Sequence, residues 1–107
     1  MKNTKVNIKM EQTFADGERD CVSMDTIADV TLDNEVLRVA IEGREMTFEI
    51  GKTHPYCYPV AGGEVILNIT TEKLLQTENV FDIEYKISDA SGGLISNNKL
   101  KMELENI

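Results

Sequence analysis

The chain has 107 residues, with 11 Lys and Arg against 19 Asp and Glu, which gives a formal net charge of −8. This length fits one small domain, residues 1–107, with a single core. The acidic balance argues against nucleic-acid binding, which needs clustered Lys and Arg. We expect no membrane helix, because no run of about 18 apolar residues exists, and no secretory signal, because Met1–Lys5 leads into polar residues. A cytoplasmic domain is therefore expected.

Apolar and polar residues alternate along most of the chain, which predicts strands with one dry face and one wet face. A first strand over residues 5–14 is followed by a hairpin turn at Asp16–Gly17. A second strand extends over about residues 18–32. Its alternation is interrupted at Asp25–Thr26, which predicts a bulge or a bend there.

The second half of the chain continues this pattern with one exception. Two short strands are predicted at residues 36–42 and 45–50. Residues 53–63 hold both prolines and the only histidine, which predicts an edge strand, a corner or an irregular crossing. Later strands are predicted at residues 64–71, 81–88 and 99–104. Residues 71–76 fit either a short helix after a Thr cap or a continuation of the sheet.

These elements predict an all-β protein, an antiparallel up-and-down meander of seven to eight strands. A sheet of this size curls, so we expect a small barrel. Its interior is expected to be just wide enough for packed side chains or one small ligand. The residues predicted to face inward are Val6, Ile8, Met10, Phe48, Phe81, Ile83, Tyr85, Leu100 and Met102.

The chain resembles the YwiB-like family, a bacterial domain of unknown function with a calycin (lipocalin-like) β-barrel. The segments that carry the resemblance are Met46–Gly51, Tyr56–Pro59, Gly62–Val65, Thr70–Thr71, Asp82–Ile87 and Gly93–Leu100. The chain departs from the family in having Tyr58 where Thr is expected, and in lacking a hairpin between the third and fourth strands. The resemblance thus implies a shortened, incompletely closed barrel, whose open edge a second copy could cover. It implies no activity.

The sequence offers few groups for catalysis, so we expect no enzyme, no cofactor and no metal. His54 is the only histidine, which excludes a metal cluster of several histidines within one chain, and we expect it exposed in a turn. Cys21 and Cys57 lack Cys-x-x-Cys spacing and are expected to be buried, inert thiols. A disulfide between them would require neighbouring strands. The carboxylates, among them Glu42 and Glu45, are expected on solvated strand faces.

Tyr56 and Tyr58 are the residues that point most to a function. Their alternate spacing places both side chains on one side of a strand. At a barrel mouth they could stack on a small apolar ligand, or they could instead plug the barrel end. The candidate ligand-binding residues, at the mouth or in the interior, are Tyr56, Tyr58, Tyr85, Phe48 and Phe81.

Two functions follow from this pattern. The first is a non-enzymatic binding module for a small apolar ligand. The alternative is a structural or protein-interaction module that self-associates, as a homodimer, through an exposed sheet edge.

Overall fold

The structure is a computed structural model that describes residues 4–105. Expectations that involve residues 1–3 and 106–107, including part of the signal-peptide prediction, lie outside the described residues. The described chain forms eight strands and no helix. They are β1 (Thr4–Phe14), β2 (Arg19–Asp33), β3 (Val36–Ile41), β4 (Arg44–Phe48), β5 (Thr53–Val60), β6 (Gly63–Thr77), β7 (Val80–Ser88) and β8 (Leu94–Leu104). Within residues 4–105, no helix could cross a membrane.

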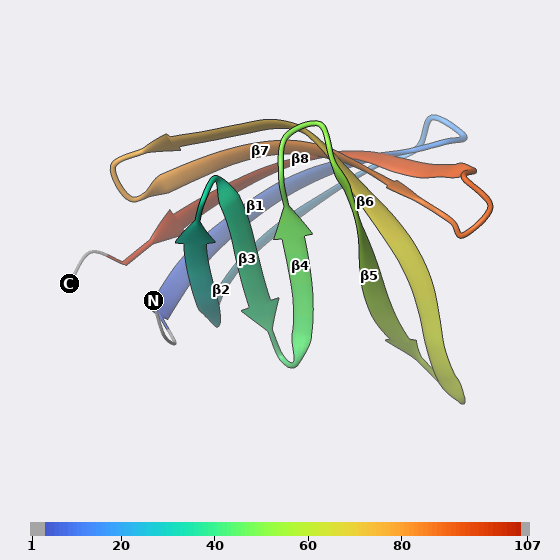
Figure 1. Ribbon diagram of the computed structural model, residues 1–107, viewed down its shortest axis with the longest axis horizontal. Helices are drawn as coiled ribbons and strands as arrows, with labels where there is room; N and C mark the ends of the chain where they lie inside the picture. The colour runs from blue at the N-terminus through green and yellow to red at the C-terminus, as the bar shows by residue number, and fades with distance from the viewer. Residues whose placement is uncertain (1–3, 106–107) are drawn as a thin grey trace.

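The eight strands form one antiparallel sheet that curls into a nearly closed barrel. Their order is β4-β3-β2-β1-β8-β7-β6-β5, so all chain neighbours except β4 and β5 pair, and β1 also pairs with β8. The strands β4 and β5 end this order and form no ladder with each other, and Figure 1 shows them diverging from the loop that joins them. The predicted meander and its incomplete closure are both confirmed.

The prolines of β5 help to keep this seam between β4 and β5 open. Val60 pairs with Gly63 across a two-residue turn, which requires these two residues to exchange hydrogen bonds. Val60 and every second residue before it therefore bond to β6. Pro55 and Pro59 lie at the positions in between, whose backbone groups point to the free edge. Proline has no N–H, so this edge lacks two of the donors that another strand would need. Residues 53–60 therefore form an edge strand, one of the three structures predicted for them.

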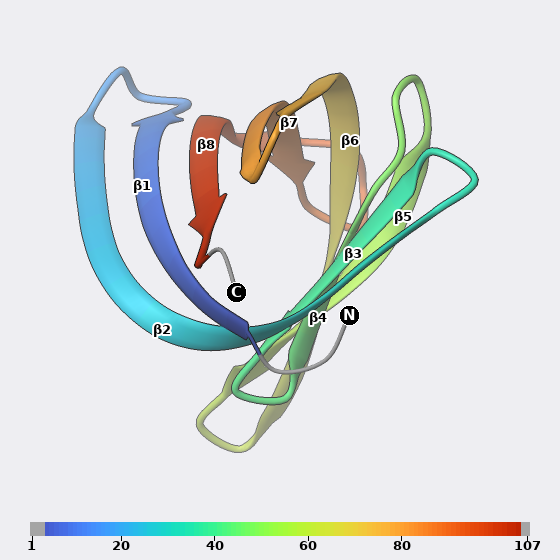
Figure 2. The same ribbon diagram turned by 90° about the vertical axis from the view of Figure 1, so that its left-hand side faces the viewer.

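The long strand β2 forms the corner at which the sheet folds over. Its residues Arg19–Ala28 pair with β1 in unbroken register, and Asp29–Asp33 then pair with β3. Figure 2 shows the strand curving between these two partners. The predicted bend is present, but a bulge at Asp25–Thr26 is wrong. The alternation only looked interrupted because the apolar side chain of Ile27 lies on the outer face, 57% exposed.

The segment 71–76, which the sequence left between helix and strand, is part of β6. It pairs with β7, and the register shifts between Thr71 and Lys73, so β6 has a bulge here. The loop that joins β4 to β5 contacts the same point, because the Gly51 N–H donates to the Thr71 carbonyl at 2.9 Å. Pairing on the sheet therefore outweighs the local helix propensity of this segment.

The core lies inside the barrel and is mainly aliphatic. Of the residues predicted to face inward, Val6, Ile8, Phe48, Phe81, Ile83, Tyr85, Leu100 and Met102 are buried, and Met10 packs against them half-buried. The largest fully buried side chains include Phe48, Leu37 and Ile69. Burial of each such side chain contributes about 1.5–3 kcal/mol. The predicted inward face is thus confirmed.

Candidate functional site

The barrel interior is hollow toward the end that carries the β1–β2 turn. A cavity of about 540 Å³ lies there, and all eight strands contribute to its wall. Of its 18 lining residues, 13 are aliphatic residues, methionines or phenylalanine, three are tyrosines, and the other two are Gln12 and Arg44. A volume of this size and an apolar wall with few polar groups are typical of small-molecule sites.

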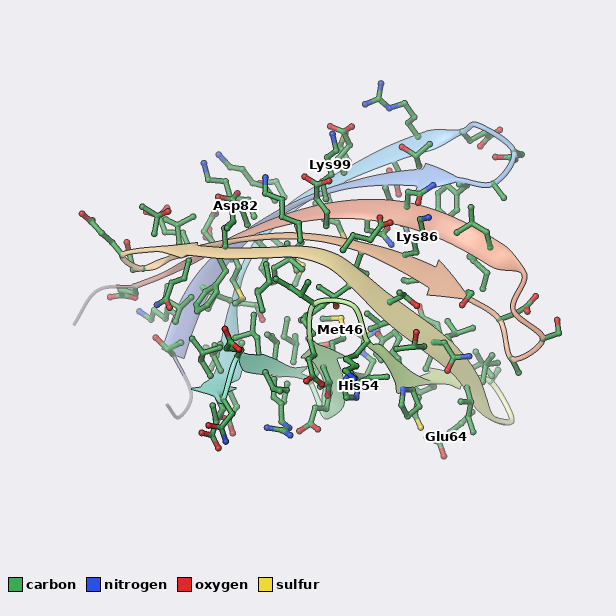
Figure 3. All side chains as sticks on the ribbon, turned by 45° about the horizontal axis from the view of Figure 1, so that its top comes forward. Met46, His54, Glu64, Asp82, Lys86 and Lys99 are labelled. Atoms are coloured by element: carbon green, nitrogen blue, oxygen red, sulfur yellow. The ribbon has the colours of Figure 1, made fainter. Side chains whose placement is uncertain are left out.

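Methionines are concentrated in this wall. The sequence has five methionines, and all four within the described residues line the cavity: Met10, Met24, Met46 and Met102. Figure 3 shows Met46 on the inner side of the curled sheet, whereas Asp82, Lys86 and Lys99 project from its outer face. Methionine side chains are flexible and polarisable, so a wall rich in them can adapt to ligands of different shape.

Three of the five predicted site residues, the tyrosines, line the cavity. Tyr56 and Tyr58 stand side by side on β5 with ring centroids 6.1 Å apart, edge to face. Tyr56 is buried, whereas Tyr58 is 41% exposed and forms part of the rim. The hydroxyl of Tyr85, deeper inside, donates to the sulfur of Met10 at 3.4 Å.

Burial disfavours ionisation of two of these tyrosines. It raises the pKa of Tyr85 well above the ordinary value of 10.0, with a smaller effect from neighbouring Tyr56. It also raises the pKa of Tyr56, although the positive charge of Arg44 opposes this shift. Both hydroxyls are therefore neutral near pH 7 and can donate hydrogen bonds.

The two phenylalanines lie elsewhere in the core. Phe48 is fully buried and packs edge to face against Tyr85, with ring centroids 5.0 Å apart. Phe81 lies toward the other end of the barrel, where it lines a separate depression with Thr4 and Gln76. Neither phenylalanine lines the cavity, so the structure brings together only the tyrosine part of the predicted set.

The cavity also has polar residues that the sequence analysis did not single out. Arg44 shares the inward face of β4 with Met46 and Phe48, and Gln12 shares that of β1 with Met10. Strict two-residue alternation places both at inward positions, so an inward-facing arginine and glutamine could have been found from the sequence.

Polar side chains continue along the inner face of β8. Ser96 and Asn98 are buried, and the Ser96 Oγ accepts from Gln12 Nε2 and from Asn98 Nδ2, both at 3.2 Å. Asn98 Oδ1 has no hydrogen-bond partner among the described residues. A buried acceptor without a partner costs about 1–3 kcal/mol. Ser96 and Asn98 thus form a strip of polar side chains on the barrel wall beside Gln12.

The residues considered for catalysis do not assemble. His54 is half-buried within β5, and its Nε2 lies 2.9 Å from Glu49 Oε1, so the expected exposed turn histidine is wrong. It follows the inward alternation of β5 instead. Cys21 and Cys57 are both exposed, because they occupy outward positions of their strands, and the expectation of buried thiols is also wrong.

The sheet order also keeps Cys21 and Cys57 apart. The strands β2 and β5 are not neighbours in the sheet, so the two cysteines cannot form a disulfide with each other. Within residues 4–105, no three His, Cys, Asp or Glu side chains cluster as metal ligands would. Glu42 and Glu45 are exposed, as expected.

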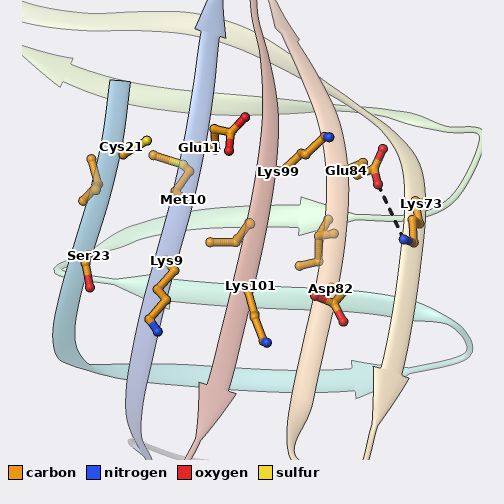
Figure 4. Close-up of a pocket in the computed structure, with 13 residues that line it drawn as sticks. Lys9, Met10, Glu11, Cys21, Ser23, Lys73, Asp82, Glu84, Lys99 and Lys101 are labelled. Atoms are coloured by element: carbon orange, nitrogen blue, oxygen red, sulfur yellow. Dashed lines mark ion pairs between the residues drawn. The ribbon is translucent and has the colours of Figure 1, made fainter. Parts of the chain in front are cut away.

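A shallow groove of about 480 Å³ on the outer face of the sheet is a second hollow (Figure 4). It crosses five strands, and its lysines are interleaved with carboxylates. Lys99 lies between Glu11 and Glu84 on the neighbouring strands, and Lys73 pairs with Glu84 at 3.5 Å. These charges balance one another on a solvated surface, so the groove lacks the apolar character of the interior cavity.

The fold and the cavity define a small antiparallel β-barrel with a partly hollow, apolar interior. The structure is similar to the crystal structure of the ywiB protein from Bacillus subtilis, with a TM-score of 0.51 and 13% sequence identity. The alignment covers 97% of this chain and 94% of that chain. The likeness confirms the YwiB-like barrel as a fold and nothing beyond the fold. No family model and no curated protein matches the sequence.

Proposed function

We propose that the protein is a non-enzymatic binding protein that holds a small apolar ligand inside the barrel. The observation that carries this proposal is the cavity of about 540 Å³ with its almost entirely apolar wall. Transfer of apolar ligand surface from water into such a site contributes about 25 cal/mol per Å². A barrel filled with side chains throughout would have no room for a ligand, whereas this one has a cavity toward the end that carries the β1–β2 turn.

The side chains of the wall support binding rather than catalysis. Among the described residues that line the cavity there is no carboxylate, histidine or cysteine. The guanidinium of Arg44 has N–H donors and no acceptor, so it cannot act as a general base. The wall therefore supplies shape, apolar surface and hydrogen-bond donors, which suit recognition of a ligand.

The two tyrosines of β5 fit a mouth better than a plug. The cavity remains behind Tyr56, and Tyr58 is partly exposed at its rim. Tyrosine combines an apolar ring with a polar tip, which suits the boundary between a dry cavity and water. These residues would contact a ligand where it enters.

A thermal-shift titration with 1-dodecanol, kept below its solubility limit, tests the proposal. A ligand that binds the folded state raises the melting temperature by mass action. We expect this increase for the wild type and for Ile66→Trp, because Ile66 lies on the outer face of β6, 56% exposed. We expect a smaller increase in Leu67→Trp, because residue 67 lines the cavity and the larger ring takes part of its volume.

The two variants place the same bulky residue on opposite faces of one strand, so each controls for the other. Circular dichroism shows whether both retain the β-sheet spectrum of the wild type. The proposal fails if dodecanol does not stabilise the wild type, or if Leu67→Trp binds it as tightly as Ile66→Trp does.

A further inference from the structure

The charge inside the cavity differs from the charge of the whole chain. The protein carries a net charge of −8, yet among the described residues that line the cavity the one charged side chain is Arg44, a cation. Burying part of an arginine against apolar residues costs free energy unless an anion or hydrogen-bond acceptors compensate it. The wall contains no anionic residue that could do so.

The guanidinium of Arg44 lies at the mouth, among the tyrosines. Its carbon atom is 5.6 Å from the ring centre of Tyr58, a distance that allows a cation–π interaction. It also interacts with the side chain of Tyr56. Arginine and the two tyrosine hydroxyls thus gather several hydrogen-bond donors at one point of an apolar cavity.

The carboxylate nearest to Arg44 is a weak partner. Arg44 Nη2 lies 3.7 Å from Glu42 Oε2, and the side chain of Glu42 is 73% exposed. An exposed ion pair of this length contributes little to stability. Most of the five N–H donors of the guanidinium therefore remain free for another acceptor.

We propose that the ligand of the barrel is an anionic amphiphile, with its apolar chain in the cavity and its carboxylate or phosphate head group bound by Arg44. Guanidinium binds both kinds of anion through paired hydrogen bonds. The tyrosine hydroxyls beside it are further donors to the head group. This inference rests on the proposed binding function and specifies the class of ligand.

The cavity volume sets the size of the apolar chain. Dividing about 540 Å³ by the roughly 30 Å³ that one water-sized unit occupies in a liquid gives space for roughly 18 non-hydrogen atoms. Dodecanoate and dodecyl phosphate are probes of this size, and 1-dodecanol is the matched uncharged probe.

Isothermal titration calorimetry of these three probes, each below its aggregation concentration, tests the proposal. We expect the wild type to bind one or both anions at least about tenfold more tightly than dodecanol. Arg44→Gln should weaken binding of the anion by about ten- to a hundredfold and change dodecanol binding far less. Arg38→Gln, which removes an exposed arginine from the outward face of β3, is the matched control and should bind all three as the wild type does.

The outcomes separate this inference from the proposed function. If dodecanol and the anions bind equally, or if Arg44→Gln and Arg38→Gln are indistinguishable, the anionic class is wrong while the binding function stands. If no probe binds the wild type, both are wrong. A preference for dodecanoate over dodecyl phosphate identifies the head group as a carboxylate, and the reverse preference identifies a phosphate.

Discussion

At the scale of single residues, the buried tyrosines connect the core to the cavity. Tyr85 is 3% exposed, packs against Phe48 and directs its hydroxyl to the sulfur of Met10. A phenolate in this position would be a buried charge without a cation beside it, which is why burial raises the pKa of Tyr85. The folded protein therefore resists ionisation of this group.

This pKa shift predicts a loss of stability in alkali. Because the folded-state pKa lies above the ordinary value of 10.0, the unfolded chain loses this proton first as the pH rises. The contribution of Tyr85 to the free energy of unfolding is therefore complete below about pH 10 and declines above it. Tyr85→Phe loses the weak hydrogen bond to the Met10 sulfur, so its free energy of unfolding near pH 7 should be lower by about 1 kcal/mol or less. In alkali, this free energy should decrease less than that of the wild type. Urea unfolding at about pH 7 and about pH 10.5 checks this. An equal decrease in the free energy of unfolding for both proteins between these two pH values would contradict it.

The residue scale also shows how far alternation alone predicts a site. It places Tyr56, Tyr58 and Tyr85 inward, and the same rule places Arg44 inward although the residue type suggests a surface position. Cys21 and Cys57 were predicted buried from their residue type, and alternation on their strands would have placed them outward. The position on the strand therefore predicted the direction of these side chains better than the residue type did.

At the scale of elements, the short turns set the register of the barrel. The β3–β4 hairpin turns at Glu42 and Gly43, with φ values of 51° and 78°. Two positive φ angles are typical of a type I′ turn, which favours Asn followed by Gly. Glutamate is strained in this conformation because its Cβ crowds the backbone.

Glu42→Asn should therefore stabilise the protein. We expect a gain of about 0.5–1 kcal/mol, because Asn tolerates a positive φ and the exposed ion pair with Arg44 that is lost contributes little. The melting temperature should rise by a few degrees, about 4–8 °C per kcal/mol. Glu45→Asn, in the extended strand that follows, is the control and should give no gain. A melting temperature of Glu42→Asn at or below the wild type would contradict the strained turn.

The edge of β5 makes a further element-scale prediction. Pro55 and Pro59 remove N–H donors from this edge, which is a common protection against pairing with another chain. We expect a monomer for the wild type, and concentration-dependent association when both prolines are replaced by threonine. Light scattering after size-exclusion chromatography checks both. A wild-type dimer would favour the alternative function, self-association through the sheet edge, and a monomeric double variant would show that the prolines do not protect this edge.

Two elements show where local sequence was insufficient. Residues 71–76 contain helix formers, and only their pairing with β7 makes them a strand. The interruption at Asp25–Thr26 reflects only the outward Ile27, whereas the corner of β2 comes from a change of partner strand from β1 to β3 after Ala28, which depends on the whole sheet. Pairing between distant segments decides both cases, and a local pattern does not contain it.

At the scale of the whole molecule, the barrel combines a packed core with a cavity toward the end that carries the β1–β2 turn. The meander and the inward face could be predicted, because two-residue alternation with short turns permits few other folds. The cavity could not be predicted, because its volume depends on the curl of the sheet and on the open seam between β4 and β5.

The methionine methyl groups offer the most direct test that an apolar ligand enters the barrel. Met10, Met24, Met46 and Met102 line the cavity and can be labelled with carbon-13 and observed by NMR during a titration with 1-dodecanol. We predict shifts of these four signals and nuclear Overhauser contacts between the dodecyl chain and the methyl groups nearest the mouth. Saturating dodecanol that leaves all four signals unchanged would contradict a ligand-binding interior.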